Sequence, residues 1–344
     1  VFNDAGPLGQ RADAKTNLGR SNETETVLRR HLHAALVHLN PGLPEEAYSN
    51  AIRQLTEANA AQSLLQTNRE FYALIRGGVK VSYRARQGGM EIRTLRVIDF
   101  ENPDANHFLC VRELWIKGAL YRRRADIVGF VNGLPLLFIE VKNLHRNLER
   151  AHRENLSDYR DTIPHLFHHN AIAILGNGHK AVVGAYSTPF KFFREWKRLD
   201  EDDKGVVDMA TLLKGVCGKT SFLDLVENFI LFDESAGETI KIVAQNQQFL
   251  GVNKAVAAVK HRQDLGGKLG VFWHTQGAGK SYSMVFFARK VHRKLGANFT
   301  FLVLTDREDL DNQIYRTFVG SGAVNENDNV RASGGEDLKS KLTD

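Results

Sequence analysis

The chain has 344 residues, and its 46 Lys and Arg against 40 Asp and Glu give a formal net charge of +6. With 42% hydrophobic and 25% charged residues it has ordinary globular composition, which excludes a disordered tail, a coiled coil and a collagen-like fibre. Two cysteines cannot form a disulfide framework or a metal-binding set, and no apolar run reaches the ~18 residues of a membrane span. We therefore expect a cytoplasmic protein of two domains, with a mild charge that permits a polyanionic partner.

The first hundred residues are predicted to be helical and then stranded. The sequence does not begin with Met, so we interpret it as a processed or trimmed piece, with residues 1–20 as a loose lead-in. Apolar residues at helical spacing predict a first helix from Ser21 to Leu39, capped by Asn22 or Thr24. Two more helices and two strands are then expected, over 45–56, 64–75, 79–84 and 91–100.

A β-hairpin is predicted in the most strand-like part of the chain, residues 108–142. The runs ADIVGFV and LPLLFIEVK flank Asn132-Gly133, and Asn-Gly between apolar runs is the strongest short-range hairpin signal. A helix and two strands should follow, over 148–160, 171–175 and 180–186.

The register of this hairpin decides whether its charged residues meet. A two-residue loop would pair Asp126 with Ile139, and Glu140 would then face the other way. A three-residue loop or a bulge at Pro135 would put Asp126 opposite Glu140. We predict the second arrangement because Pro135 has no N–H for the ladder. Lys142 is two residues from Glu140 and shares its face.

Converging carboxylates at this strand end would suit phosphodiester chemistry. Asp126, Glu140 and the Val141 carbonyl offer hard oxygen ligands to Mg²⁺. Such an ion polarises a phosphate oxygen and acidifies a water molecule, and Lys142 could orient that water and offset transition-state charge. The alternative is a surface ion pair at the end of a strand, and these residues alone leave both interpretations open.

The run RRRADIVGFVNGLPLLFIEVKN resembles the amino-terminal nuclease domain of the motor/restriction subunit of type I restriction enzymes. The resemblance extends upstream through NETETVLRRHLHAAL, NREFYALIRGGV and VIDFENPDANHFLCVRELWI. It implies a PD-(D/E)xK nuclease-like mixed sheet flanked by helices. It also implies Asp126, Glu140 and Lys142 as the cleavage residues, with Glu23 or Glu25 as an early-helix acid.

The same family often carries a Q-x-x-x-Y element after the lysine strand. Here Tyr159 is present, but Asn155 stands where Gln would be, so the role of the element is open. Arg124 and Tyr159 are the candidate DNA contacts of this domain. The basic residues around the hairpin either contact DNA phosphates or form a solvated helix face balanced by Glu149 and Glu154. They are Arg122, Arg123, Arg124, Arg146, Arg150 and Arg153.

A second pattern follows the charged, apolar-poor residues 200–206, which suggest a domain boundary. Helices are expected over 209–216 and 221–229. Residues 268–319 then read strand, Gly-rich loop, helix, strand, helix, which predicts a second, parallel sheet. The loop has the form T-x-G-x-G-K-[ST], a helicase variant of the phosphate-binding loop. Its candidate nucleotide ligands are Thr275, Gln276, Gly277, Ala278, Gly279, Lys280 and Ser281.

This loop has the chemistry of an ATP site. Gly277 and Gly279 let backbone N–H groups turn toward phosphates, and a helix that begins near Lys280 presents its positive end to the same anion. Lys280 can reach the β- and γ-phosphates, and Ser281 can ligate Mg²⁺. We therefore expect ATP and Mg²⁺ to bind here.

Two neighbouring segments resemble superfamily 2 helicases and translocases. IKIVAQNQQFLGVNKAV resembles the adenine-reading element, with Gln248 as the reader, although it could also be a polar helix start. FLVLTDREDLDNQIYRTF resembles the helicase segment that contacts the DNA backbone. Its Thr305, Asp306 and Arg307 are expected at the carboxyl end of a parallel strand. The whole run looks like the type I restriction motor.

Together these resemblances imply a DNA endonuclease and ATP-dependent DNA translocase that cuts double-stranded DNA, with separate methylation and specificity subunits as partners. We find no Asp-Glu-Ala-His-like box after residue 320, so this piece alone is expected to be a poor ATPase. The expected organisation is a lead-in over 1–20, a nuclease domain over 21–200, a helical linker with the adenine element over 201–260, and an incomplete RecA-like parallel α/β lobe over 261–344.

Two other functions remain open from the sequence. An ATP-driven DNA remodeller could use the nuclease fold only to bind DNA, and carboxylates of Asp126 and Glu140 on opposite faces or beyond ~6 Å would favour it. A P-loop phosphotransferase acting on a small molecule would lack DNA affinity, so a salt-dependent DNA-binding assay would identify it.

Overall fold

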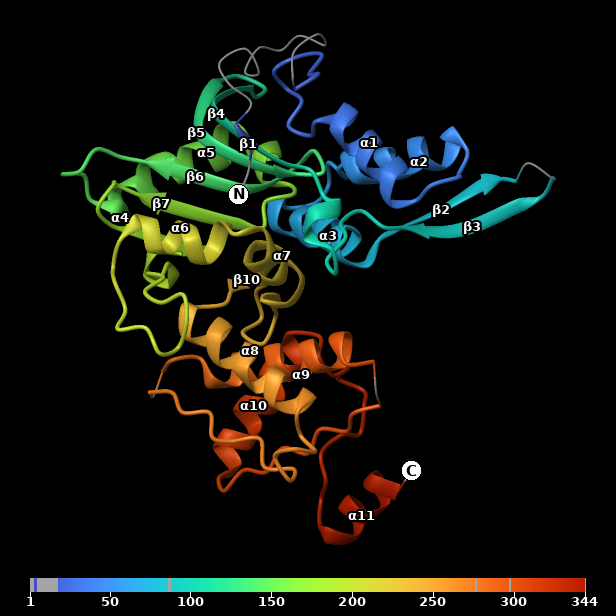
Figure 1. Ribbon diagram of the computed structural model, residues 1–344, viewed down its shortest axis with the longest axis vertical. Coiled ribbons are helices and arrows are strands. Elements are labelled where there is room, and N and C mark those ends of the chain that lie inside the picture. Colours follow the sequence, from blue (N-terminus) through green and yellow to red (C-terminus); the bar gives the residue numbers. More distant parts are fainter. Residues whose placement is uncertain (1–2, 5–17, 86–87, 276, 297, 344) are drawn as a thin grey trace. The chain divides into compact units, whose positions relative to one another are not determined.

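The computed structural model describes residues 3–4, 18–85, 88–275, 277–296 and 298–343 (Figure 1). The chain divides into two compact units. Unit 1 comprises Val1–Leu231 and Lys241–Asn253, and unit 2 comprises Phe232–Ile240 and Lys254–Asp344. The division lies further along the chain than the charged stretch 200–206 that composition indicated.

Unit 1 is built on a mixed sheet of six strands in the order β1-β4-β5-β6-β7-β8 (Figure 1). The pairs β1–β4 and β6–β7 are parallel, and the other neighbours are antiparallel. The strands are β1 (Asn3–Asp4), β4 (Phe108–Lys117), β5 (Arg122–Val131), β6 (Leu134–Val141), β7 (Ile172–Gly176) and β8 (Ala181–Gly184). The mixed sheet expected from the sequence is therefore present.

The Asn-Gly turn between β5 and β6 is confirmed and is packed against the amino-terminal region. Asn132 and Gly133 have φ values of 51° and 81°, and Val131 pairs with Leu134 across them. The Gly133 carbonyl accepts a hydrogen bond from Leu28 N at 2.8 Å. A Cβ atom on Gly133 would lie 2.5 Å from the Leu28 carbonyl oxygen, so no larger residue fits without movement.

The helices of unit 1 flank this sheet and match most of the predicted ones. The helix predicted from Ser21 begins only at Arg29, because the Asn22 side chain accepts hydrogen bonds from Thr24 N and Glu25 N and closes a separate turn. The helices are α1 (Arg29–Leu39), α2 (Glu45–Thr56), α3 (Leu64–Gly77), α4 (Leu148–Arg150), the π-helical segment η3 (Ala151–Leu156), α5 (Ser157–Thr162), α6 (Met209–Cys217), α7 (Lys219–Asn228) and α8 (Asn246–Lys260), which ends in unit 2.

Two small antiparallel elements and three short turns complete the described architecture. Strand β2 (Val79–Arg84) pairs with β3 (Met90–Leu95), and β9 (Ile230–Asp233) pairs with β10 (Ile240–Val243). The 3₁₀ turns are η2 (Pro103–Ala105), η4 (Pro164–Phe167) and η5 (Phe190–Phe192). None of the helices in the described parts of the chain has the length and apolar character that a bilayer crossing requires.

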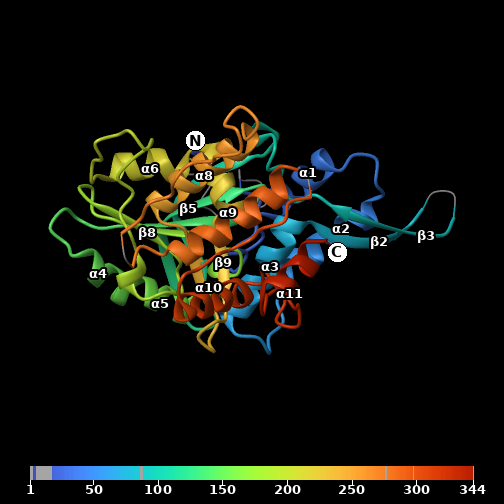
Figure 2. The same ribbon diagram turned by 90° about the horizontal axis from the view of Figure 1, so that it is seen from below.

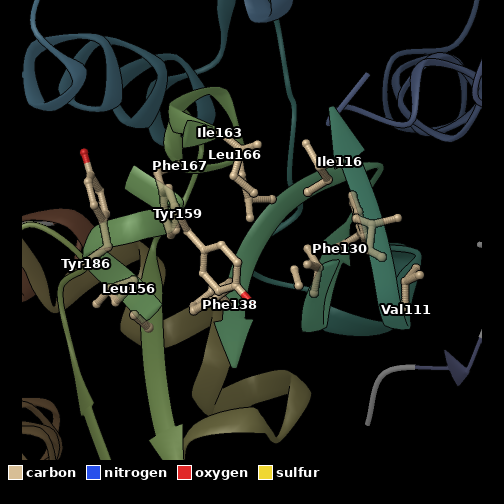
Figure 3. Packing of buried hydrophobic residues seen from close by; sticks show 14 of the residues in the cluster. Val111, Ile116, Phe130, Phe138, Leu156, Tyr159, Ile163, Leu166, Phe167 and Tyr186 are labelled. Atoms are coloured by element: carbon tan, nitrogen blue, oxygen red, sulfur yellow. The ribbon is translucent and has the colours of Figure 1, made fainter. Parts of the chain in front are cut away.

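The core of unit 1 lies between the central sheet and the segment from α4 to η4 (Figure 3). Phe138 of β6 pairs with Val128 of β5 and contacts the rings of Tyr159 and Phe167 in T-shaped arrangements, with centroid distances of 5.6 and 5.4 Å. Residues two apart on a strand share a face, so Asp126 projects from the same face as Val128, at the end of the apolar cluster.

Unit 2 contains α9 (Lys280–Lys294), α10 (Glu308–Gly320) and α11 (Gly335–Thr343). The strands predicted over 268–273 and 299–305 are absent, so the parallel sheet of the expected RecA-like lobe does not form among the described residues. Val271, Trp273 and Leu304 are instead 95, 78 and 80% exposed. An apolar run becomes a strand only when a neighbouring strand takes up its backbone hydrogen bonds, and these two runs have no such neighbour in the described part of unit 2.

Candidate functional site

The candidate acidic site lies where β5 and β6 diverge from their shared turn. A two-residue turn alone would pair Asp126 with Ile139. One extra residue on β6, Leu136, shifts the register by one, and Asp126 therefore lies directly opposite Glu140. The structure has both the two-residue turn and a bulge, but the bulge is at Leu136 and not at Pro135.

Two hydrogen bonds hold the three residues predicted for cleavage at the same strand ends. The Asp126 carboxylate accepts a hydrogen bond from Val141 N at 2.9 Å, and the Lys142 ammonium donates to Oε1 of Glu140. The side chain of Glu140 is 1% exposed and that of Lys142 is 23% exposed. The structure thus brings Asp126, Glu140 and Lys142 together, with the ammonium at the solvent side and Glu140 beneath it.

Burial dominates the electrostatics of Glu140. It raises the pKa of this carboxyl to about 7; the hydrogen bond from Lys142 acts against the shift, and the nearby Asp126 carboxylate adds to it. At neutral pH the folded protein therefore holds Glu140 close to its midpoint. A cation beside this carboxyl would favour the ionised form, as expected for a metal-binding position.

Tyr159 lies beneath the carboxylates and not on the surface. Its ring is 6% exposed, and its hydroxyl donates to the Arg124 carbonyl at 2.9 Å (Figure 3). Burial, with the negative charge of Glu140 second, raises the pKa of this hydroxyl well above its usual range, so it stays protonated. Tyr159 therefore positions β5 beside Glu140, and its ring is not presented to DNA as the sequence had suggested.

The residues present fit a divalent cation. Oε2 of Glu140 is buried and has no hydrogen-bond partner, and a buried carboxylate oxygen in that state is stabilised by a bound cation. Asp126 and the Val141 carbonyl would supply further hard oxygens from the same strand ends. No group of three or more His, Cys, Asp or Glu side chains suited to a metal occurs among the described residues, so the site has two carboxylates only.

A basic cleft of about 430 Å³ opens beside Lys142. Lys142 and Arg146 give the cleft positive charge, while Asn155, which replaces Gln in the Q-x-x-x-Y element, lies in its wall. Its lining residues are Val141, Lys142, Asn143, Arg146, Asn147, Arg150, Ala151, Glu154 and Asn155. A cleft of cations and amide side chains next to paired carboxylates is suited to a phosphate backbone.

The arginines at the start of β5 each have a carboxylate partner. Arg123 bonds Asp158 at 2.6 and 2.9 Å, and Arg124 lies 3.2 Å from Glu113. Arg150 is likewise paired with Glu154 at 2.7 Å. Of the two interpretations left open by the sequence, the contact of Arg123 matches the balanced surface, whereas Arg146 and the Arg150–Glu154 pair line the cleft.

The two early acids do not join the carboxylate pair. Glu23 is held by Arg122 in two hydrogen bonds of 2.6 and 2.5 Å, and Glu25 accepts from Ser21 N at 2.9 Å. Both precede α1, so neither is on the early helix as the sequence had suggested. Arg122 is four residues from Asp126 on β5, which is roughly 13 Å along an extended strand.

Glu113 is a neighbour of the site that the sequence did not indicate. The β4–β5 register places Arg112 opposite Ile127 and Leu114 opposite Ala125, so Glu113 falls beside Asp126. Its φ of 52° is unusual for a non-glycine residue within a strand. Only the pairing of β4 with β5 would have indicated that Glu113 lies near the site, and this pairing could not be derived from local sequence.

The phosphate-binding loop has the local geometry that its glycines predict. Gly277 and Gly279 have φ values of 79° and 77°, and α9 begins at Lys280 without a side-chain cap. Its first N–H groups therefore face outward at the positive end of the helix. The exposed Lys280 ammonium donates to the His274 carbonyl at 2.9 Å. Gln276 lies outside the described residues.

The helix that carries Lys280 and Ser281 is anchored within unit 2. Tyr282 donates to Asp233 at 2.6 Å, and Ser235 donates to the same carboxylate at 2.8 Å. Asp233 is 2% exposed. These contacts were not foreseen from the sequence, because Asp233 precedes the loop by some forty residues.

The other predicted nucleotide and DNA contacts have local structural roles here. Gln248 is 2% exposed, and its Oε1 accepts from Gln245 N at 2.8 Å, as a residue in the first turn of a helix does when it caps that turn. Thr305 and Asp306 lead into α10 and do not end a strand, because the strand before them is absent. Arg307 precedes α10 and pairs with Asp309 at 2.5 Å.

Two family models match this chain. Residues 6–192 match the family described as type I restriction enzyme R protein N terminus, and residues 247–344 match the SWI2/SNF2 ATPase family. The second unit is therefore similar to a fragment of an SNF2-like ATPase.

Curated relatives are consistent with these matches. The type I restriction enzyme HindI endonuclease subunit of Haemophilus influenzae is 37% identical over 312 residues, which is 87% of this chain and 29% of the relative. A putative type I restriction enzyme endonuclease subunit, MjaIXP, of Methanocaldococcus jannaschii is 27% identical over 329 residues, again 87% of this chain and 31% of the relative. The chain thus spans less than a third of the length of these relatives.

Proposed function

The chain belongs to the type I restriction enzyme R protein family, and on that premise we propose that unit 1 hydrolyses DNA phosphodiester bonds with Mg²⁺ at Asp126, Glu140 and Lys142. The observation that carries this proposal is the bulge at Leu136, which puts Asp126 opposite Glu140. A register without it would separate the carboxylates onto opposite faces.

Each residue has a distinct task in this proposal. Asp126, Glu140 and the Val141 carbonyl would hold the ion, which when bound would polarise a phosphate oxygen and acidify a water molecule. Lys142 lines the cleft and would stabilise the negative charge that develops on the phosphate. Arg146 would hold the backbone of the bound strand in the same cleft.

For unit 2 we propose that the loop from Thr275 to Ser281 binds ATP with Mg²⁺ and belongs to a DNA translocase. The glycine conformations and the uncapped start of α9 support phosphate binding. Translocation is proposed for the longer subunit, working on double-stranded DNA in the cytoplasm with methylation and specificity subunits. A piece of this length is expected to turn over ATP poorly.

The test is Lys142→Ala in the full-length subunit, assembled with its partner subunits. We expect cleavage of plasmid DNA to fall by at least 100-fold while ATP turnover stays within about twofold, because Lys142 belongs to unit 1 and the phosphate-binding loop to unit 2. Lys117→Ala, an exposed lysine on β4, is the matched control and should cleave normally. Loss of both activities in Lys142→Ala would show that the site is misassigned.

The remodeller alternative predicts a different result. Carboxylates of Asp126 and Glu140 on opposite faces, or well separated, would have favoured a remodeller. The register of β5 and β6 gives no support to that arrangement. If the wild-type complex translocates DNA with Mg²⁺ and ATP but never cuts it, the remodeller would replace the nuclease as the conclusion.

A further inference from the structure

The hairpin β2–β3 extends beyond the helices of unit 1 on which it is based (Figures 1 and 2). Its six residue pairs run without interruption from Val79 opposite Leu95 to Arg84 opposite Met90. At about 3.3 Å per residue, this ribbon is ~20 Å long. It is separate in sequence and in fold from the β5–β6 carboxylates.

One face of the hairpin is fixed to unit 1. Val79, Val81 and Tyr83 alternate along β2 and are 0, 2 and 3% exposed. Helix α2 also binds the edge of β2, since Asn50 donates to the Ser82 carbonyl at 3.2 Å and Gln54 to the Lys80 carbonyl at 3.0 Å. The ribbon is therefore held in one orientation by packing and by hydrogen bonds.

The opposite face is exposed, and its own residues include two cations and no carboxylate; Glu46 of α2 accepts a hydrogen bond from Arg84 N at 3.4 Å at the end of β2. Paired residues in an antiparallel ladder project to the same side, so this outer face has one row from each strand. Met90 and Ile92 are 67 and 63% exposed. The outer face consists of Lys80, Ser82 and Arg84 from β2 and Met90, Ile92 and Thr94 from β3.

The hairpin as a whole also has an excess of positive charge. Residues 79–96 contain five basic side chains and one carboxylate, Glu91, which accepts a hydrogen bond from Tyr83 at 2.8 Å. Arg93 is exposed beside that pair, and Arg96 is engaged by Asp99 at 2.7 Å. The five basic residues are Lys80, Arg84, Arg86, Arg93 and Arg96.

We propose that the outer face of β2–β3 binds duplex DNA, as a contact separate from the cleavage cleft. A two-stranded ribbon fits the ~12 Å major groove, where Lys80 and Arg84, both on β2, would reach the phosphates along one side of the groove. Met90 and Ile92, on the neighbouring strand β3, would contact base methyl groups and sugars on the groove floor. A 20 Å ribbon covers roughly six base pairs at 3.4 Å each.

The complementary charge favours DNA over a protein surface as the occupant. Two apolar side chains flanked by cations form too small a patch for a stable protein interface, which normally buries about 800 Å² on each side. The choice of DNA as the polyanion rests on the proposed function, but binding by this face does not require cleavage. The hairpin would hold the duplex while the cleft acts on one strand.

The test compares two variants of the full chain that each lose two positive charges. The hairpin variant is Lys80→Gln/Arg84→Gln, which removes both cations of the outer face. The control, Arg29→Gln/Lys204→Gln, removes exposed cations from other parts of unit 1. A fluorescent 30-base-pair duplex is titrated with each protein in EDTA, so that cleavage cannot occur, at several salt concentrations. Circular dichroism melting confirms that each variant is folded.

The hairpin variant should bind on the order of 10- to 100-fold more weakly at 0.15 M salt, and its slope of log Kd against log salt should fall by about 2. The control should stay within about threefold of wild type. Equal binding by the two variants would overturn the proposal. So would unchanged DNA affinity combined with failure to assemble with the partner subunits, which would assign the face to a protein.

The failure of this inference is distinguishable from the failure of the proposed function. Lys142→Ala is scored by DNA cleavage with Mg²⁺, whereas the hairpin variant and its control are compared by binding in EDTA, where no cleavage occurs. A cleaving Lys142→Ala would disprove the nuclease assignment without affecting the hairpin. A hairpin variant that binds as well as its control would disprove the hairpin contact and leave the nuclease assignment intact.

Discussion

Glu140 in unit 1 is 1% exposed and enclosed by β5, β6 and Tyr159, whereas Lys280 in unit 2 is exposed at the start of a helix. The acidic site depends on residues from two paired strands and on Tyr159 of α5. The phosphate-binding loop depends mainly on two glycine conformations and on the helix that follows them. Substitutions that disturb packing should therefore disrupt the geometry of the acidic site. Substitutions in the phosphate-binding loop should instead weaken ligand binding and have little effect on the fold.

Substitution of Gly133 and of Gly277 allows the most direct test of this contrast. Gly133→Ala should have the largest effect on stability. Gly133→Ala should lower the free energy of unfolding by about 3 kcal/mol, because positive φ costs 1–2 kcal/mol and the new Cβ would also overlap the Leu28 carbonyl. Gly277→Ala, with φ also positive but open space around it, should cost only ~1 kcal/mol. Urea unfolding of both variants measures the difference; equal costs would contradict the contrast.

Lys280→Ala should affect the ligand and not the fold. We expect the affinity for an ATP analogue to fall about 10- to 100-fold, or ~1.4–2.7 kcal/mol, because the ammonium would meet the phosphates. Its thermal unfolding should be unchanged, since the side chain is exposed and bonds only one backbone carbonyl. Titration of the full-length subunit with a fluorescent analogue measures this, and Lys260→Ala is the control. Unchanged affinity would remove Lys280 from the site.

Glu140→Gln should reveal the cost of burying a carboxylate. Because the folded pKa of about 7 lies above the ordinary value of 4.5, stability from this group is complete below pH 4.5 and is lost as pH rises through 7. In EDTA the variant should therefore match wild type near pH 4.5 and exceed it by about 3 kcal/mol at pH 8.

The same variant tests the proposed cation site without measuring activity. Mg²⁺ at pH 8 should raise the melting temperature of wild type but not that of Glu140→Gln. Glu149→Gln, an exposed carboxylate on α4, should show neither the pH effect nor the loss of the Mg²⁺ effect. Equal stabilisation of Glu140→Gln by Mg²⁺ would place the ion elsewhere.

Arg122→Gln should have the smallest effect. The Arg122–Glu23 pair is half exposed, and the guanidinium also lies 4.0 Å from the centre of the Trp115 ring. Solvent screens such exposed contacts, so they contribute little to stability. The melting temperature should fall only slightly, and DNA cleavage by the full complex should be unchanged. A large loss of cleavage would show that Glu23 or Arg122 acts at the site after all.

Much of the fold could be predicted from local signals. The helices over 45–56 and 64–75, the Asn-Gly turn and the strands on either side of it were all indicated by spacing and turn chemistry. The convergence of Asp126 and Glu140 could be predicted only as one of two registers. The burial of Tyr159 and the proximity of Glu113 could not be predicted, because each depends on a strand or helix distant in sequence.

The sequence by itself determined which residues can carry chemistry: the glycines and lysine of the phosphate loop, the Asn-Gly turn, and the carboxylates and lysine on the flanking strands. These signals act over a few residues, where backbone sterics decide the outcome. Only the tertiary structure decided that Leu136 forms the bulge, that Gln248 is buried at a helix start, and that the apolar runs at 268–273 and 299–305 form no strands. Strand register and pairing depend on hydrogen bonds to distant segments, and no local pattern specifies which segments will meet.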